Sequence, residues 1–542
     1  MDNSEIIGRY EALKSERSGI EEKWRDIEEY VTPYRGEFFK NSDNELSVEW
    51  SRYGSDYDST AVMAHQNLAA SLHGSLTSPS VRWFEMRYRD EDLNKDPQAT
   101  EWLQEVSDRI YYELQDSNFN LEVNETYQDL VGLGTSVLTL EEAPGEDGWN
   151  GLLFSSVPVK ESYFEEDYQK RVLRFYRELK WTPQQIISKF GDDVPQSIKD
   201  AEEGKDTEKR TVLYTIFPRG GRIVPIGEKR SPSKRPLVSR YILVQEKATL
   251  GKDGGLYEMP AYVARWRKTS GSKWGNSPAM FAMGDIKSLN TAKKQILIAS
   301  EKRIEPPILA EERANVMDLD LRSGQVSVVR DIDGVKAWDS GHDIYVSQEL
   351  VNDLQASIKE YFFSNDLSFP EPQGTPMSAT EAQIRYELMQ RLLGPTLGRL
   401  ENDLLTPIVA RAFKMLMREQ RLPQPPQSVI DKNADFDVVY IGPLARAQRS
   451  DRVTSIERLS GFVANLAQIN PETLDVFNFD EAIRHAGRDL GVPAELLRGS
   501  DDVEQIRDAR AEQQMAMQEA MIAEQQGKAA QAQAEGQNVT RQ

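Results

Sequence analysis

The chain has 542 residues, of which 39% are hydrophobic and 28% charged, and it contains no cysteine. The lack of cysteine excludes disulfides, thiolate zinc sites and cysteine nucleophiles, and we expect an intracellular folding compartment. The formal net charge of −22 argues against tight, sequence-specific binding of DNA, because that requires basic side chains that neutralise phosphates. The N-terminus has no apolar signal core, and no stretch has the apolar length needed to span a bilayer, so we expect no membrane association.

The first 142 residues are expected to be mainly helical. Apolar residues recur at helical spacing over 2–30, where Asn3 or Ser4 is the expected N-cap. Two further helices are predicted over 59–79 and 97–119, and a fourth segment is predicted to change from helix to strand around Gly132 and Gly134.

Residues 150–270 are expected to be rich in β-structure, because short β-branched and aromatic runs alternate there with turn clusters. A hairpin is predicted across Gly251–Gly255, and a short helix over 182–191. Basic residues gather in one loop, which we interpret as a solvated loop or, as the less favoured alternative, a phosphate-binding patch. They are Arg219, Arg222, Lys229, Arg230, Lys234 and Arg235.

Two helices are predicted on either side of a small β-containing module. The first begins at Ser277-Pro278, where proline suits the first helical position, and runs to about residue 304. The module covers 305–343, and the second helix covers 346–363. This pattern predicts a cap carried on two helical struts.

A long helix is predicted after the proline-rich loop 364–377. Ser378 and Glu381 form a capping-box pattern at its start, and apolar residues continue at steps of three or four as far as Ile408. Gly394-Pro395 lies on this path, and proline removes a backbone donor, so a kink is expected there. The alternative is two ordinary helices that meet at a break.

The last part of the chain returns to helix. A proline-rich linker, RLPQPPQ, and a short strand, FDVVYIGPL, precede residues 446–525, which are expected to be helical. The tail 526–542 is low in apolar residues and is expected to fray.

Motifs for catalysis or metal binding are missing from the sequence. It has no phosphate-binding P-loop, no G-x-S-x-G elbow and no H-E-x-x-H motif. His65 and His73 lack a completing carboxylate pattern, so ordinary hydrogen-bonded histidines are expected. The pairs Asp318/Asp320 and Asp331/Asp333 lack the spacing of a calcium loop and are interpreted as turn residues. We therefore predict no catalytic residue, no metal site and no cofactor.

Three stretches resemble the portal protein, or head-to-tail connector, of short-tailed, podovirus-type bacteriophages. The first combines residues 10–38 with residues 60–86, and is similar to the start of that family. The second, WGNSPAMFAMGDIKSLN (274–290), is similar to the beginning of the family's channel helix. The third, MSATEAQIRYELMQRLLGP (377–395), is similar to its long kinked helix. The resemblance covers nearly the whole chain and is weakest over the last hundred residues.

The resemblance implies an α+β, mainly helical portal fold whose subunits form a ring. It implies a wing at 1–277 with a β-rich part at 150–270, and stem helices at 278–303 and 344–363 that line a channel. Between them 304–343 would be the clip, followed by a tunnel loop at 364–377. The kinked wing helix with its linker and strand would occupy 378–445, a helical crown 446–525, and a flexible tail 526–542.

The resemblance also implies function and partners. The chain would form a dodecameric ring at one capsid vertex, through which double-stranded DNA passes without sequence specificity. Terminase would dock on the ring, followed by tail adaptor or tube proteins, with major capsid, scaffolding and internal core proteins as further partners. The protein would reside in the virion at the portal vertex, and in the host cytoplasm during assembly. The alternatives are a structural or scaffolding virion protein without a channel, and a metal-dependent hydrolase or nuclease.

A few basic rings would suffice to steer DNA through an acidic channel, whereas a uniformly basic wall would hold the phosphates too tightly. Each basic candidate could instead pair with a carboxylate across a subunit interface, and Lys359 is a weaker candidate. The tunnel loop would hang into the hole, where Phe369 could pack against a neighbouring subunit. The channel candidates are Lys287, Lys293, Lys294, Lys302, Arg303 and Phe369.

Overall fold

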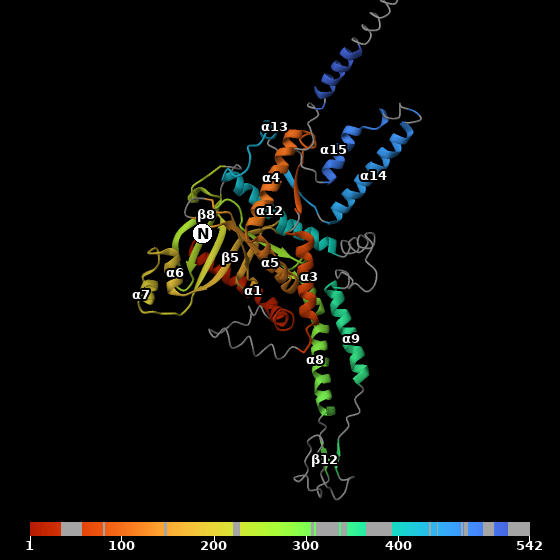
Figure 1. The fold of residues 1–542 in the computed structure, drawn as a ribbon. Coiled ribbons are helices and arrows are strands. Elements are labelled where there is room, and N and C mark those ends of the chain that lie inside the picture. Colours follow the sequence, from red (N-terminus) through yellow and green to blue (C-terminus); the bar gives the residue numbers. More distant parts are fainter. Residues whose placement is uncertain are drawn as a thin grey trace, which may run out of the picture. The chain divides into compact units, whose positions relative to one another are not determined.

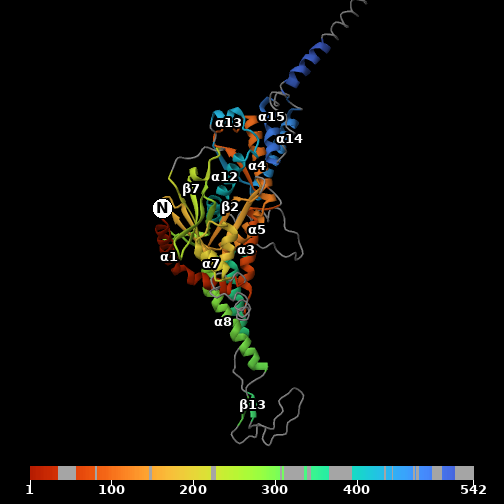
Figure 2. The same cartoon turned by 90° about the vertical axis from the view of Figure 1, so that its left-hand side faces the viewer.

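The chain is a mainly helical protein with several small antiparallel sheets, as the α+β prediction requires (Figures 1 and 2). It divides into two compact units, Met1–Glu85 with Val106–Gln424, and Met86–Glu105 with Pro425–Gln542. The computed structural model describes residues 1–33, 57–79, 82–145, 149–220, 228–304, 308–310, 335–337, 344–364, 393–432, 435–441, 443–467, 470, 475–490, 503 and 505–518.

Helices α1, α3 and α5 belong to the first unit; α3 packs against α5, whereas the buried residues Ile6, Ile7 and Tyr10 of α1 pack against the large sheet. The three helices span Asn3–Tyr30, Thr60–Leu76 and Phe119–Leu133. The cap of α1 is Asp2, which accepts a hydrogen bond from the Ser4 amide, so the expected cap at Asn3 or Ser4 was wrong. The predicted change from helix to strand is confirmed, because Gly134 adopts φ 77° and β2 follows it directly.

Two antiparallel sheets form the β-rich part of the first unit. The larger has the strand order β4-β5-β6-β7-β8, and the smaller has the order β3-β2-β9. Helices α6 (Pro183–Phe190) and α7 (Gln196–Glu203) lie between β5 and β6 in the chain, and Thr182 with Gln185 forms a capping box at α6. The strands are β2 Thr135–Glu142, β3 Leu152–Val157, β4 Ser162–Glu166, β5 Val172–Trp181, β6 Arg210–Pro218, β7 Leu237–Leu243, β8 Ala248–Leu256 and β9 Ala261–Arg265.

The predicted hairpin across Gly251–Gly255 was wrong. The turn between β7 and β8 lies at residues 244–247, and the glycines lie within β8 itself. A Cβ at Gly254 would collide with the Ser239 hydroxyl, and one at Gly255 would collide with the Pro232 carbonyl. These glycines therefore allow close packing beside an irregularity in the β7–β8 register, rather than a turn.

Helix α1 is fixed to the large sheet by a buried polar network. The Arg17 guanidinium donates to the carbonyls of Val159, Lys160 and Ser162 and, at 2.7 Å, to the Tyr163 hydroxyl. The Glu178 carboxylate accepts from the hydroxyls of Tyr10 at 2.6 Å and Tyr163 at 3.1 Å. Lys14 donates to the same carboxylate at 3.1 Å.

This network makes stability depend on pH in a defined direction. Burial alone would raise the pKa of Glu178, but the hydrogen bond from Tyr10 and the charge of Lys14 outweigh it and hold the pKa below its ordinary value. A depressed pKa in the folded state adds stability above the unfolded value, and this contribution is lost as the pH falls through the folded value. We therefore expect Glu178→Gln to be destabilised at neutral pH and to lose less further stability on acidification than the parent. Urea unfolding from about pH 7 to about pH 3 measures this, and parallel curves would contradict it.

The rest of the first unit consists of helices and short strand pairs. Helix α8 (Pro278–Ile304) and helix α9 (Ile344–Tyr361) run side by side (Figure 1). Strands β12 and β13 pair in antiparallel fashion between them in the chain, within the region predicted as a β-containing module. The short strands are β10 Arg267–Lys268, β11 Gly275–Asn276, β12 Ile308–Ala310 and β13 Val335–Ala337.

The end of the predicted long helix contains a π-helical turn. Residues 393–400 are α-helical, Glu401–Leu405 is a π-helix, and α12 follows at Thr406–Arg418. Pro407 has no amide hydrogen for an α-helical bond to Asp403, and the Thr406 amide bonds to Glu401 instead. The described helix begins at Leu393, so the turn before Gly394-Pro395 lies outside the described residues and the predicted kink is not tested.

Among its described residues, the second unit contains one strand pair and several helices. Strands β1 (Phe84–Tyr88) and β14 (Phe436–Tyr440) form a two-stranded sheet, and Arg89 pairs with Asp437 at 2.7 Å. Residues 505–518 are also helical. The predicted strand and return to helix after residue 436 are therefore confirmed for the described residues. The helices are α4 Pro97–Asp116, which begins in this unit, α13 Gln427–Asp431, α14 Pro443–Ala467 and α15 Phe479–Leu490.

Candidate functional site

The base of α8 is built by the WGNSP motif. The buried Trp274 ring packs edge-on against Trp24, with ring centres 5.1 Å apart, and against Phe164 at 4.9 Å. The Gly275 amide donates to the Thr135 hydroxyl at 2.9 Å, and its Cα faces the Gly134 carbonyl so closely that a Cβ would overlap that oxygen. The motif thus attaches the start of α8 to α1 and to the start of β2.

The predicted start of α8 is confirmed. The Ser277 hydroxyl accepts from the Met280 amide at 3.0 Å, and Pro278 occupies the first helical position, where no amide hydrogen is needed. Ile286 and Leu289 are buried on the side that faces the body of the unit and α9. Beyond them the described part of α8 projects from the body beside α9 (Figure 1).

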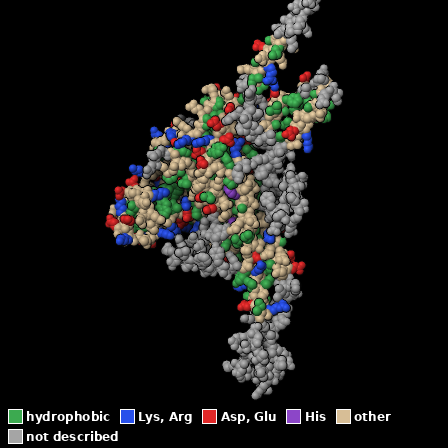
Figure 3. Space-filling view, viewed as in Figure 1, with side chains coloured by type: hydrophobic (Ala, Val, Ile, Leu, Met, Phe, Trp, Pro, Cys, Tyr) green, Lys and Arg blue, Asp and Glu red, His purple; other side chains and the backbone are tan. Residues whose placement is uncertain are grey.

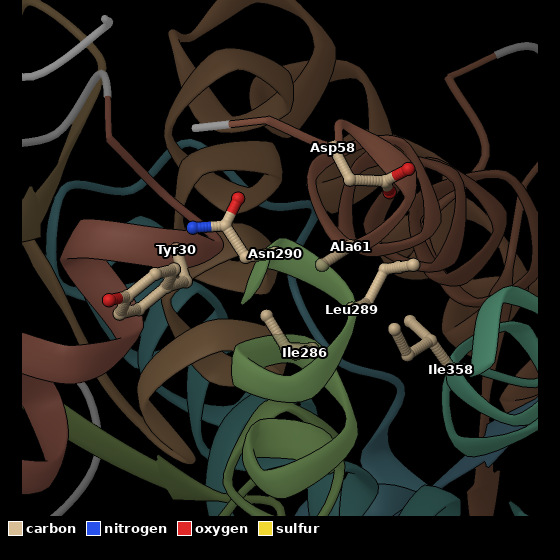
Figure 4. A pocket seen from close by; sticks show the side chains of 7 residues that line it. All are labelled: Tyr30, Asp58, Ala61, Ile286, Leu289, Asn290 and Ile358. Atoms are coloured by element: carbon tan, nitrogen blue, oxygen red, sulfur yellow. The ribbon is translucent and has the colours of Figure 1, made fainter. Parts of the chain in front are cut away.

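Helices α8 and α9 are held in register by a polar contact and an apolar one. The Ser357 hydroxyl donates to the Asp285 carboxylate at 2.6 Å, and Ile358 shares a cavity lining with Ile286 and Leu289. Figure 4 shows this cavity between the end of α1, the start of α3, α8 and α9. Its volume is about 10 Å³, room for roughly one water molecule, so it is too small for an organic ligand. It is lined by Tyr30, Asp58, Ala61, Ile286, Leu289, Asn290 and Ile358.

Asp58 connects three segments at this cavity. Its carboxylate accepts from the Thr60 amide and the Gln355 side-chain amide, both at 2.8 Å, and pairs with Lys293 at 3.2 Å. Burial alone would raise the pKa of Asp58, but these hydrogen bonds outweigh it and hold the pKa below its ordinary value. The start of α3, α8 and α9 are therefore joined by one ionised carboxylate. Sequence reasoning missed Asp58, because nothing local marks it among 88 acidic residues.

The six channel candidates have different environments. Lys287 pairs with Asp26 of α1 at 2.7 Å and Lys293 pairs with Asp58, so both hold α8 to the rest of the unit. Lys294 is exposed and lies 5.8 Å from the centre of the Tyr57 ring. Arg303 is exposed near the end of α8. The Lys302 side chain and Phe369 lie outside the described residues, as do the cap residues Ser378 and Glu381.

The other sequence interpretations concern histidines and basic residues. The His65 ring is hydrogen-bonded to the Gln128 carbonyl and the His73 ring to the Thr77 hydroxyl, as ordinary histidines should be. In the basic loop, Lys229 pairs with Glu419 and Arg230 with Glu228. Among the described residues, no group of three acidic or histidine side chains could hold a metal ion. None of the helices in that part of the chain has the length and apolarity needed to cross a membrane.

Comparisons with known proteins identify the family. The model of the family described as "Bacteriophage head to tail connecting protein" matches residues 3–497. The "Probable portal protein" of Bordetella phage BPP-1 is 29% identical, with the match covering 95% of this chain and 92% of that protein. The "Portal protein" of Salmonella phage epsilon15 is 26% identical, and the match covers 95% of this chain and 92% of that protein. The "Portal protein" of Escherichia phage T7 is 24% identical, and the match covers 96% of this chain and 93% of that protein. The chain therefore belongs to the family of bacteriophage head to tail connecting proteins.

Proposed function

We propose that this head to tail connecting protein is a portal subunit, twelve copies of which form a ring at one vertex of the capsid. Double-stranded DNA would enter through the ring during packaging and leave through it during ejection, without sequence-specific contacts. The observation that carries the proposal is that three relatives named as portal proteins match over 92–93% of their own lengths. As a member of this family the chain is a structural connector, not an enzyme.

Each part of the chain would form one region of the portal subunit. Residues 1–277 and 378–445 would form the wing, the helices at 278–303 and 344–363 the stem, and 304–343 the clip. The loop 364–377 would reach the channel, and 446–525 would form the crown, followed by the tail 526–542. The attachment of α8 to α1 and β2 through WGNSP supports a stem fixed rigidly to the wing.

Ion pairs within the chain leave fewer candidates for contact with DNA. Lys287 and Lys293 already have carboxylate partners within the chain, so their charge is partly neutralised. Arg303 is exposed and forms no ion pair with the described residues, and we propose it as a DNA-facing side chain, together with Lys302 and Phe369. A small number of basic side chains in an acidic protein would guide DNA without stalling it.

The partners follow from a portal role. Terminase would dock on the ring during packaging and be replaced by tail adaptor or tube proteins, while major capsid, scaffolding and internal core proteins would contact the head side. The protein is a component of the phage at the junction of head and tail. Before that, the ring would assemble in the host cytoplasm.

Negative-stain electron microscopy combined with mass photometry of the purified full-length chain tests the proposal. We expect rings with an axial hole and a mass near 739 kDa, twelve times the 61.6 kDa of one chain. A monomer, or an oligomer without a hole even at high protein concentration, would contradict the channel. The alternative would then be a structural or scaffolding virion protein that assembles without one.

A further inference from the structure

One exposed flank of α8 carries two lysines at regular helical spacing, of which Lys287 is paired with Asp26 and Lys294 has no carboxylate partner among the described residues. Lys287, Thr291, Lys294 and Ile298 follow one another at intervals of four, three and four, so they share one face. All four are exposed, whereas Ile286 and Leu289 on the opposite face are buried. An exposed isoleucine beside a lysine is typical of a surface that is covered in an assembly.

Helix α9 has a matching flank of the opposite charge. Glu349, Asp353, Ala356 and Glu360 follow the same spacing of four, three and four, and all are exposed. The opposite face of α9 carries Val351, Ile358 and Phe362, which are buried. Within the described residues, the three carboxylates form no ion pair, so their charge is not neutralised inside the chain.

The register of the two helices places opposite charges at the same level. The hydrogen bond from Ser357 to Asp285 aligns these two residues across the antiparallel pair. Lys294 lies nine residues after Asp285, and Glu349 lies eight residues before Ser357, so each lies about 12–14 Å from that bond in the same direction. Lys294 and Glu349 nevertheless form no ion pair with each other within the described part of the chain.

We propose that the α8 flank of one copy packs against the α9 flank of the next copy, with Lys294 paired to Glu349 and Asp353 of that neighbour. The proposal rests on the ring proposed above and names the contact that closes it. One chain carries both complementary flanks, which is the requirement for a head-to-tail contact that repeats around a ring. Ile298, 42% exposed, and Leu350, 52% exposed, would supply apolar area beside the ion pairs.

A second copy fits these surfaces better than DNA does. Phosphates would attract Lys294, but they would be repelled by the acidic residues of α9 at the same level. Figure 3 shows basic, acidic and hydrophobic side chains mixed along the part of the molecule formed by α8 and α9. Opposite charges across a contact also select the register and the correct partner surface.

Charge reversal of the two flanks tests the contact. We expect Lys294→Glu alone, and Glu349→Lys with Asp353→Lys, each to shift the concentration at which rings form upward by about tenfold or more, because like charges then face each other. The variant with all three changes should return to within about threefold of the parent, because the charges are again complementary. Mass photometry over a dilution series measures the ring fraction, with circular dichroism to verify folding.

The control is Lys252→Glu in β8, an exposed lysine without an ion pair among the described residues, which should assemble like the parent. Parent rings should also weaken between about 0.05 and about 0.5 M NaCl, a measurement that needs no variant. Single-flank variants that assemble like the parent, or a folded combined variant that does not recover, would overturn the contact while leaving the ring intact. A parent that forms no ring would instead overturn the proposed function.

Discussion

Replacing Gly275 with alanine is expected to destabilise the first unit by about 3 kcal/mol or more. The new Cβ would overlap the Gly134 carbonyl oxygen, and it would lie 3.0 Å from the Gly134 carbonyl carbon and 3.2 Å from the Arg265 Cβ. The backbone at Gly275 cannot shift easily to relieve this overlap, because it is held by the Thr135 hydroxyl and by the pairing of β11 with β10. Gly134 is itself constrained, since its φ of 77° favours glycine.

Urea unfolding of the monomeric chain measures this effect, and Gly284→Ala in α8 is the matched control. A Cβ at Gly284 meets nothing within 4 Å, and alanine is the better helix former, so this change should be neutral or stabilising by up to about 1 kcal/mol. Equal midpoints for the two variants would contradict the close approach of Gly275 to Gly134. The contrast matters for function because Gly275 fixes the direction in which α8 leaves the body.

The elements that could be predicted from sequence are those with strong local signals. The start of α8 follows from the serine cap and from proline at the first turn, and both act within one helical turn of the boundary. The change from α5 to β2 follows from Gly134, because a left-handed residue ends a helix wherever it occurs. Such signals do not depend on distant parts of the chain.

The error at the predicted hairpin arose because its glycines serve distant partners. Gly254 and Gly255 resembled a turn, but they are required by the Ser239 side chain and the Pro232 backbone, which come from other segments. The π-helical turn at Glu401–Leu405 was not predicted, although Pro407 is a local signal for an irregular turn there.

The candidate site shows the same limit. Lysines on a predicted channel helix could be identified by position, but the carboxylates that pair with Lys287 and Lys293 lie more than 200 residues away in sequence. Spacing along α8 cannot distinguish a lysine that attaches a helix from one that faces solvent. The tertiary structure was therefore needed to show that Lys287 and Lys293 attach α8 to the rest of the unit, whereas Lys294 and Arg303 are exposed.

Replacing Arg265 with methionine is expected to cost about 3–5 kcal/mol, because it removes the central charge of a buried network. The Arg265 side chain is 5% exposed, and it pairs with the equally buried Glu166 of β4 and with Asp403 at 3.3 Å. Lys268 also pairs with Glu166, at 2.5 Å. In the Arg265→Met variant, Lys268 would be the only cationic partner of Glu166 among the described residues. Methionine fills a similar length but leaves Asp403 without a cationic partner there.

The position of Asp403 gives this loss a local consequence. Asp403 lies in the π-helical turn, so Arg265 of β9 is the ionic link between the small sheet and the irregular part of the long helix. We expect Arg265→Met to lower the urea midpoint and also to increase amide exchange over Glu401–Leu405 before global unfolding, because the turn loses its attachment. Arg267→Met, on the exposed neighbouring position of β10, should change stability by less than about 0.5 kcal/mol. If Arg265→Met destabilised the protein without faster exchange at 401–405, the network would support the sheet alone, and the π turn would be held by Pro407 and its apolar packing.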